Sequence, residues 1–315
     1  ATRSRFAPDR GLTMRMLSTM FLLGLLYVVF IGILIVLLSR AGVSLIFVVV
    51  IAGGFLLAQY FFSDKLAMFA MHAHEVTPQQ APELHAVVDR LCAMADMPKP
   101  RVAIADTDVP NAFATGRNQK KAVVCATTGI LRRLDAVELE GVLAHEMSHV
   151  AHRDVAVMTI ASFLGILAGL LTRFGLQFGL FGGFGGRDRR GGNDSNTLPV
   201  MLIVILVSAV VYAISFLLIR GLSRYRELAA DRSAALLTAR PSALASALTK
   251  VSGDMARIPT RDLRHAEPFN AFFFTPAFAK GKGGFSLSQL FSTHPTLDRR
   301  LEQLAKISTQ IGQGV

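Results

Sequence analysis

Charged residues are scarce in this sequence of 315 residues, since Asp, Glu, Lys and Arg together make up 17% of it. A soluble domain usually contains about 25%. Cysteine is also rare: Cys92 and Cys125 cannot form a disulfide framework, and each falls in an apolar stretch that suits a small core residue. There is no spaced pattern of aromatic and basic side chains, so we do not interpret the net charge of +11 as a nucleic-acid surface. The low share of charged residues points to a membrane protein.

Four apolar runs account for the low charge. Each is close to the roughly 20 residues that a helix needs to cross the hydrocarbon core of a bilayer. A secretory signal peptide has a shorter apolar region and a small-residue cleavage site, so the first run is expected to be a retained transmembrane helix. We therefore expect a mainly α membrane protein with about four transmembrane helices. The runs cover residues 17–38, 43–62, 155–171 and 198–219.

Arginines near the first run predict its orientation. Arg3, Arg5, Arg10 and Arg15 lie before residues 17–38, and basic residues favour the cytoplasmic side, where they face anionic lipid headgroups. The first two runs are separated by a very short turn, so they form a hairpin with both ends in the cytoplasm. The expected location is the inner (plasma) membrane of the cell, with several spans.

The second pair of runs allows two interpretations. A glycine-rich loop at residues 182–196 joins them and contains Arg187, Arg189 and Arg190. If both runs span the bilayer, these arginines lie outside the cytoplasm, against the usual trend. The alternative is a hydrophobic hairpin that dips into the membrane or packs on itself. We favour two spans.

The segment after residue 62 has the composition of a globular α+β domain. A helix is expected over residues 82–94, and β-branched runs predict strands at residues 101–105 and 121–126. Between the strands, residues 111–116 form a candidate edge strand, which either binds an extended peptide by main-chain pairing or is an ordinary sheet edge. The candidate substrate-binding residues are Asn111, Ala112, Phe113 and Ala114.

The most informative segment is a His-Glu-x-x-His sequence that begins at His145. Residues 134–143 lead into it with apolar side chains at helical spacing and no proline. On a helix, His145 and His149 share one face, so both imidazoles can bind one zinc ion. Glu146 then lies where a general base is needed to take a proton from water. The alternative is two histidines on a partly wet helix face with Glu146 solvated.

A third zinc ligand must come from a segment on the same side of the membrane. Residues 220–231 follow the fourth run and return to that side, with Glu227 and Asp231 at positions i and i+4 of a helix. We expect Glu227 to complete the ligand set and leave an open position for water. We expect Asp231 to accept the second ring N–H of a zinc-bound histidine. The alternative is a charged helix face that pairs Glu227 with Arg224. The competing ligands are His152 and Asp154.

Taken together, these motifs resemble the HtpX/Ste24 family of membrane-bound zinc endopeptidases, peptidase family M48, and most closely its bacterial HtpX branch. The resemblance rests on residues 111–116, the segment 145–149, Glu227, and the pair His294 and Pro295. It implies a cytoplasmic protease domain with a zincin fold of the gluzincin type and one Zn²⁺ per chain. It also implies polypeptide substrates, chiefly misfolded or damaged membrane proteins cleaved in protein quality control under stress.

The resemblance also assigns two residues near the end of the sequence. His294 matches a family histidine next to the zinc and would stabilise the oxyanion of a tetrahedral intermediate. Arg300 matches a family arginine that orients Glu227 or holds the substrate backbone. Relatives often have a second proline where this sequence has Thr296, a departure that affects the local turn.

The predicted organisation has four parts. Residues 1–62 form the first hairpin, 63–154 the first part of the protease domain, 155–219 the second hydrophobic hairpin, and 220–315 the rest of the protease domain, with a phenylalanine-rich loop at 259–284. Two other functions are considered. A scaffold with structural zinc needs a fourth protein ligand, which the sequence does not supply at plausible spacing. An intramembrane chamber that trims prenylated peptides, as in the other family branch, needs more than four spans.

Overall fold

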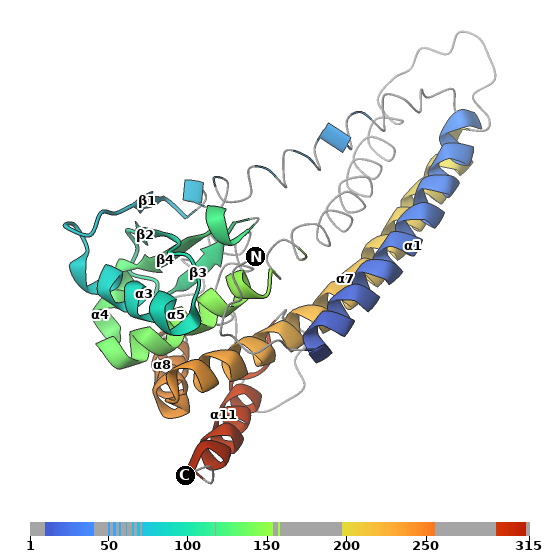
Figure 1. The fold of residues 1–315 in the computed structure, drawn as a ribbon. Coiled ribbons are helices and arrows are strands. Elements are labelled where there is room, and N and C mark those ends of the chain that lie inside the picture. The colour runs from blue at the N-terminus through green and yellow to red at the C-terminus, as the bar shows by residue number, and fades with distance from the viewer. Residues whose placement is uncertain are drawn as a thin grey trace. The chain divides into compact units, whose positions relative to one another are not determined.

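The computed structural model is mostly helical and describes residues 10–40, 71–116, 118–153, 197–255 and 294–312, with isolated positions at 50–69 and at 157 (Figure 1). The chain divides into two compact units. We call them the α+β unit (Ala1–Thr13, Phe61–Ala156 and Ser223–Val315) and the helical unit (Met14–Tyr60 and Val157–Leu222).

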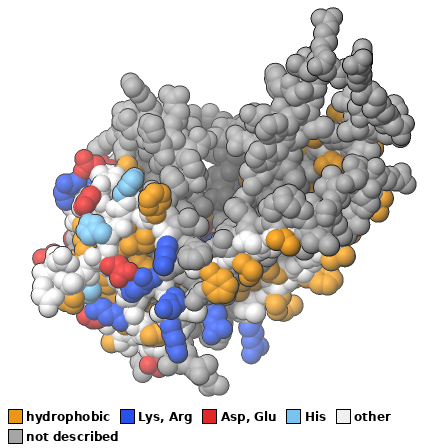
Figure 2. Space-filling view, turned by 90° about the horizontal axis from the view of Figure 1, so that it is seen from above, with side chains coloured by type: hydrophobic (Ala, Val, Ile, Leu, Met, Phe, Trp, Pro, Cys, Tyr) orange, Lys and Arg blue, Asp and Glu red, His pale blue; other side chains and the backbone are white. Residues whose placement is uncertain are grey.

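Two long helices form the described part of the helical unit. α1 (Arg10–Arg40) and the first part of α7 (Thr197–Thr238) run antiparallel, and Leu23 and Phe30 of α1 pack with Val211 of α7 (Figure 1). Both helices are long and apolar enough to cross a membrane, over Arg10–Ile33 and Leu202–Thr238. Many of their hydrophobic side chains, such as Phe21 at 72% exposure, lie on the surface, and Figure 2 shows such residues in orange.

The expected spans correspond to these helices only in part. The run at 17–38 lies within α1, which begins earlier, at Arg10, and the run at 198–219 lies within α7, which continues to Thr238. The apolar run marks the segment suited to lipid, whereas the helix itself tolerates the flanking arginines. Four predicted segments fall outside the described residues, apart from isolated positions: 43–62, 155–171, 182–196 and 259–284.

A four-stranded sheet lies at the centre of the α+β unit. Its order is β1-β2-β4-β3, with β2 and β4 parallel and the outer pairs antiparallel. β3 is therefore at an edge of the described sheet, as residues 111–116 were predicted to be. The predicted strand at 121–126 begins two residues later, because Gln119–Lys121 forms a 3₁₀ turn capped by the Asn118 side chain. The strands are β1 (Ala73–Glu75), β2 (Arg101–Ala105), β3 (Ala112–Thr115) and β4 (Val123–Thr127).

Helices cover one face of this sheet and build the main core. Strand residues Val102 and Val124 pack in this core with apolar side chains from the helices. On the other face of the sheet, Ala103, Phe113 and Cys125 form a second, smaller cluster. The helices of the unit, besides the end of α7, are α3 (Pro82–Ala95), α4 (Thr128–Arg133), α5 (Ala136–Ala151), α8 (Pro241–Met255) and α11 (Leu297–Gly312).

Helix α5 is held firmly at its start. Asp135 caps its first turn, and the Glu138 side chain accepts a hydrogen bond from the backbone N–H of Asp135, which completes a capping box. Glu138 is also bound from α8, by Ser246 Oγ at 2.6 Å and Lys250 Nζ at 2.8 Å. Burial raises the pKa of Glu138, but these hydrogen bonds outweigh burial and lower its pKa overall. The helix that carries the His-Glu-x-x-His segment is thus fixed in direction and rotation.

Candidate active site

His145 and His149 lie one turn apart on α5, and both are buried. Their ring centroids are 4.9 Å apart and the ring planes are nearly perpendicular, at 89°. The prediction that both imidazoles lie on one face of the helix is confirmed, because the spacing of four residues brings their Nε2 atoms to the same side.

Glu227 approaches this pair from α7. Its Oε2 atom is 3.4 Å from His145 Nε2, and its Oε1 atom is 3.6 Å from His149 Nε2. The three side chains are buried, and their ligand atoms lie within 4.8 Å of one another. Ligand atoms at about 2.0–2.2 Å from a tetrahedral zinc ion are separated by roughly 3.3–3.6 Å. The two separations that involve Glu227 are of this size, although they end on different oxygens of its carboxylate. With three buried side chains whose ligand atoms lie this close together, the donor set is compatible with a zinc ion.

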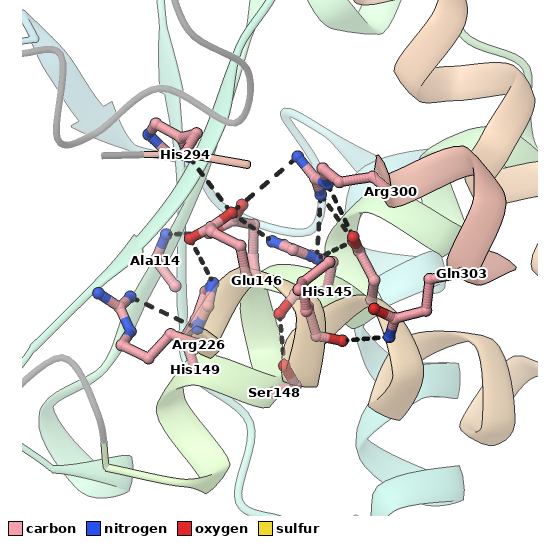
Figure 3. A network of polar contacts seen from close by, with 12 residues as sticks. Ala114, His145, Glu146, Ser148, His149, Arg226, His294, Arg300 and Gln303 are labelled. Atoms are coloured by element: carbon pink, nitrogen blue, oxygen red, sulfur yellow. Dashed lines mark hydrogen bonds and ion pairs between the residues drawn. The ribbon is translucent and has the colours of Figure 1, made fainter. Parts of the chain in front are cut away.

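A buried ion pair between Asp231 and Arg300 contacts the ligand His145 on the ring side opposite its Nε2 atom. Asp231 Oδ1 is 2.9 Å from His145 Nδ1, on the side of the ring away from Glu227. Arg300, only 1% exposed, binds Asp231 with two hydrogen bonds, Nε to Oδ2 at 2.7 Å and Nη2 to Oδ1 at 2.6 Å (Figure 3). Arg300 Nη1 also lies 4.0 Å from Glu227 Oε2. Arg300 thus lies between the carboxylates of Asp231 and Glu227.

Glu146 is tied to the edge strand. The backbone N–H of Ala114 in β3 donates to Glu146 Oε2 at 3.0 Å (Figure 3). Along a strand, the main-chain N–H and C=O groups of successive residues point alternately to the two edges of the strand. The Asn111 carbonyl accepts a hydrogen bond from the backbone N–H of Thr127, and the Asn111 N–H donates to the Thr127 side-chain Oγ1. The main-chain groups of Asn111 and Phe113 therefore face β4, whereas those of Ala112 and Ala114 face the edge of the described sheet.

The four residues expected to bind substrate differ in where their side chains and main-chain groups lie. The Phe113 side chain is buried on the far face of the sheet, and the Asn111 side chain is also buried. Neither residue has its backbone at the edge beside Glu146. Among the described residues of this segment, Ala112 and Ala114 have main-chain groups there, and a substrate role for Asn111 and Phe113 stays a prediction.

His294 and Arg226 complete the surroundings of the ligands. His294 is buried, with Nδ1 3.4 Å from Glu227 Oε2. The Arg226 guanidinium lies 3.5 Å from His149 Nδ1 (Figure 3). Sequence reasoning overlooked Arg226, although it directly precedes Glu227.

Electrostatics within this group follow from burial and close charges. Burial alone would lower the pKa of His145, but Asp231 and Glu227 raise it to about 9. Burial would raise the pKa of Glu227, yet the neighbouring His294 imidazole and the hydrogen bond with His145 hold it well below its usual range. Arg300 likewise lowers the pKa of Asp231 against the effect of burial. The pKa of Glu146 is raised, chiefly by burial. Buried carboxylates and cationic groups thus balance one another.

The structure brings together all seven predicted zinc-site residues. The competing ligand His152 lies at the end of α5, with Nδ1 2.8 Å from the Ser148 carbonyl, outside the three-ligand group found among the described residues. The other competitor, Asp154, lies outside those residues. The seven are His145, Glu146, His149, Glu227, Asp231, His294 and Arg300.

A buried group of two histidines and one glutamate, with a second glutamate directly after the first histidine, defines the class of metalloproteases with a His-Glu-x-x-His helix. The family model for Peptidase family M48 matches residues 78–308. The chain belongs to peptidase family M48, as the sequence motifs indicated, and it is a membrane metalloprotease.

Curated relatives match almost the whole chain. Protease HtpX homolog 1 of Streptomyces coelicolor is 62% identical over 311 residues, 99% of this chain and 97% of the relative. The Protease HtpX homolog of Moorella thermoacetica is 51% identical over 310 residues, 98% of each chain. The crystal structure of Ste24p from S. mikatae is similar over 94% of this chain and 67% of that one, with 18% identity and a TM-score of 0.49.

Proposed function

We propose that this chain is a zinc endopeptidase of the inner membrane, with its active site on the cytoplasmic side. Its proposed substrates are membrane-proximal segments of misfolded or damaged membrane proteins. The observation that carries the proposal is the buried group of His145, His149 and Glu227, with Glu146 between this group and an open strand edge.

His145, His149 and Glu227 would hold one zinc ion. When bound, zinc lowers the pKa of a coordinated water towards 7 and polarises the substrate carbonyl. Asp231 accepts the Nδ1–H of His145, which leaves Nε2 of that ring as the ligand atom. Arg300 holds the Asp231 carboxylate in place and offsets its charge.

Glu146 acts as general base and then as general acid. Its carboxylate takes the proton from the attacking water and delivers it to the nitrogen of the leaving amine. The hydrogen bond from Ala114 N–H orients Oε2 for this transfer. His294 is proposed to donate a hydrogen bond to the oxygen that becomes negative when water adds to the carbonyl.

The edge of β3 is the proposed substrate site. Because the Ala114 N–H binds Glu146, an extended peptide would pair with the main-chain groups of Ala112 and with the Ala114 carbonyl, and would become an additional strand beside Glu146. Main-chain pairing does not depend on the side chains of the substrate. It therefore suits a protease that recognises unfolded segments of different sequence.

A position close to the bilayer is supported by the continuity of α7. Glu227 follows the expected span at 198–219 by eight residues on the same helix, or about 12 Å along its axis. The proposal retains four spans, the four-part organisation and a gluzincin-like fold for the protease domain. A scaffold with structural zinc is disfavoured, because the group among the described residues has three ligands and not four.

The test is cleavage by the purified full-length protein in lipid vesicles, with an unfolded peptide and a membrane protein as substrates. Glu146→Gln removes the base but keeps the shape, so zinc content should stay at one per chain while cleavage falls by about 10²-fold or more. Glu227→Ala should instead lose zinc. Undiminished zinc-dependent cleavage by the Glu146→Gln protein would overturn the mechanism.

A further inference from the structure

The last described helix contacts the ligand-bearing turn of α7 at a second point. Gln303 of α11 is half-buried, and its side-chain amide Nε2 donates to the backbone carbonyl of Leu228 at 2.7 Å (Figure 3). Leu228 directly follows Glu227. The donor lies one turn beyond Arg300, on the same face of α11.

We infer that Gln303 is a positioning residue for the third metal ligand. Arg300 binds Asp231 one turn after Glu227, and Gln303 binds the backbone at Leu228. Two attachment points restrict rotation of α7 about its own axis in a way that one point cannot. The inference rests on the proposed role of Glu227 as a zinc ligand.

The geometry shows why this rotation matters. A side chain on a helix reaches about 5–6 Å from the axis, so a rotation of about 10° moves its tip by roughly 1 Å. Metal–ligand distances are defined to within about 0.2 Å. A small rotation of α7 would therefore change the distances between the Glu227 carboxylate and the two histidine Nε2 atoms by more than metal binding tolerates.

Helix α11 is a suitable anchor for such a restraint. Leu304 and Ile307 are buried in the main core, so the helix is fixed independently of the polar contacts. Gln303 is adjacent to Leu304, so the packing of Leu304 in the core also fixes the backbone position of Gln303. Nothing in the residue pattern other than its spacing from Arg300 would have drawn attention to it.

The experiment measures metal affinity of the full-length protein in detergent. Zinc is titrated against a chelator, and Co²⁺ is used as a spectroscopic probe of the ligand geometry. Gln303→Met keeps the side-chain length and removes the donor, and Gln303→Lys restores an N–H donor. Gln310→Met is the matched control, since Gln310 is exposed on the same helix.

We expect Gln303→Met to bind zinc about threefold to tenfold more weakly than Gln310→Met, the range that loss of one neutral hydrogen bond produces. The Co²⁺ spectrum should change in the same variant, and Gln303→Lys should recover both affinity and spectrum. The metal-free Gln303→Met protein should also unfold somewhat more easily than Gln310→Met, because the hydrogen bond is present without metal. The Co²⁺ spectrum is the readout that a purely structural role would leave unchanged.

The outcomes separate this inference from the proposed function. Glu227→Ala is measured alongside. If it loses zinc while Gln303→Met binds like the control, or if Gln303→Lys shows no recovery, the role of Gln303 is refuted and the ligand set stands. If Glu227→Ala binds zinc as the wild type does, Glu227 is not a zinc ligand. In that case the role of Gln303 is refuted as well.

Discussion

Removing Arg300 should destabilise the α+β unit strongly. Arg300→Met leaves the Asp231 carboxylate buried without its two charge-assisted hydrogen bonds. Removing one partner of a buried ion pair lowers the free energy of unfolding by about 3–5 kcal/mol. The value should lie near about 3 kcal/mol, because Asp231 keeps its contact with His145 at 2.9 Å. For a unit of this size, about 3 kcal/mol corresponds to a fall in Tm of about 6–12 °C.

The two cysteines provide the assay. Cys92 and Cys125 are buried in the α+β unit. Burial raises the pKa of the Cys92 thiol to about 11 and that of Cys125 to about 12, so we expect both to react slowly with a maleimide dye at neutral pH while the unit is folded. On unfolding, the thiols approach their ordinary pKa of about 8.5 and become accessible. Dye fluorescence during heating of the full-length, metal-free protein therefore reports this unit alone.

Arg299→Met is the matched control, since Arg299 is the exposed neighbour on the same helix. Its Tm should stay within about 1–2 °C of the wild type. Arg300→Lys should fall between the two, because an ammonium group offers charge without the two-point geometry of a guanidinium. If Arg300→Met shifts the Tm no more than Arg299→Met does, the ion pair does not stabilise the folded unit and the reasoning is refuted.

Two further predictions concern the capping residue of α5 and the substrate strand. The lowered pKa of Glu138 means that its bonds stabilise the fold above its unfolded pKa of about 4.3, and that this gain is lost as the pH falls through the folded value. The Tm difference between wild type and Glu138→Gln should therefore be largest near pH 7 and shrink towards pH 3; a constant difference would contradict this. Ala114→Pro removes the N–H that binds Glu146, and Ala112→Pro removes the next outward N–H. The first should lower kcat by about tenfold and the second should chiefly raise KM; equal changes in both parameters would reject the assignment.

The parts of the site that the sequence revealed are local. His145 and His149, and likewise Glu227 and Asp231, are i and i+4 pairs on single helices, so helical periodicity alone places each pair on one face. The proximity of one pair to the other followed from the expected topology. His294 and Arg300 came only from family resemblance, because contacts over such sequence distances leave no periodic pattern.

Two of the contacts that sequence reasoning missed involve backbone groups. The N–H of Ala114 and the carbonyl of Leu228 are present at every residue, so no residue type marks them. The choice of Ala112 and Ala114 over Phe113 required the register of β3 against β4, which pairs Ala114 with Val124. A shift of one residue would reverse which groups face the edge.

The arrangement of charge also explains why the ligands sit on separate, firmly anchored elements. Glu227 and Asp231 are two carboxylates one turn apart on a helix, and both are buried. Like charges at this spacing destabilise a helix, and burial increases the cost. The positive charge of Arg300 compensates them and comes from α11, far along the chain. The ligand turn of α7 is therefore stable in its buried position only while α11 is docked, so the integrity of the metal site and the packing of the last described helix should be lost together.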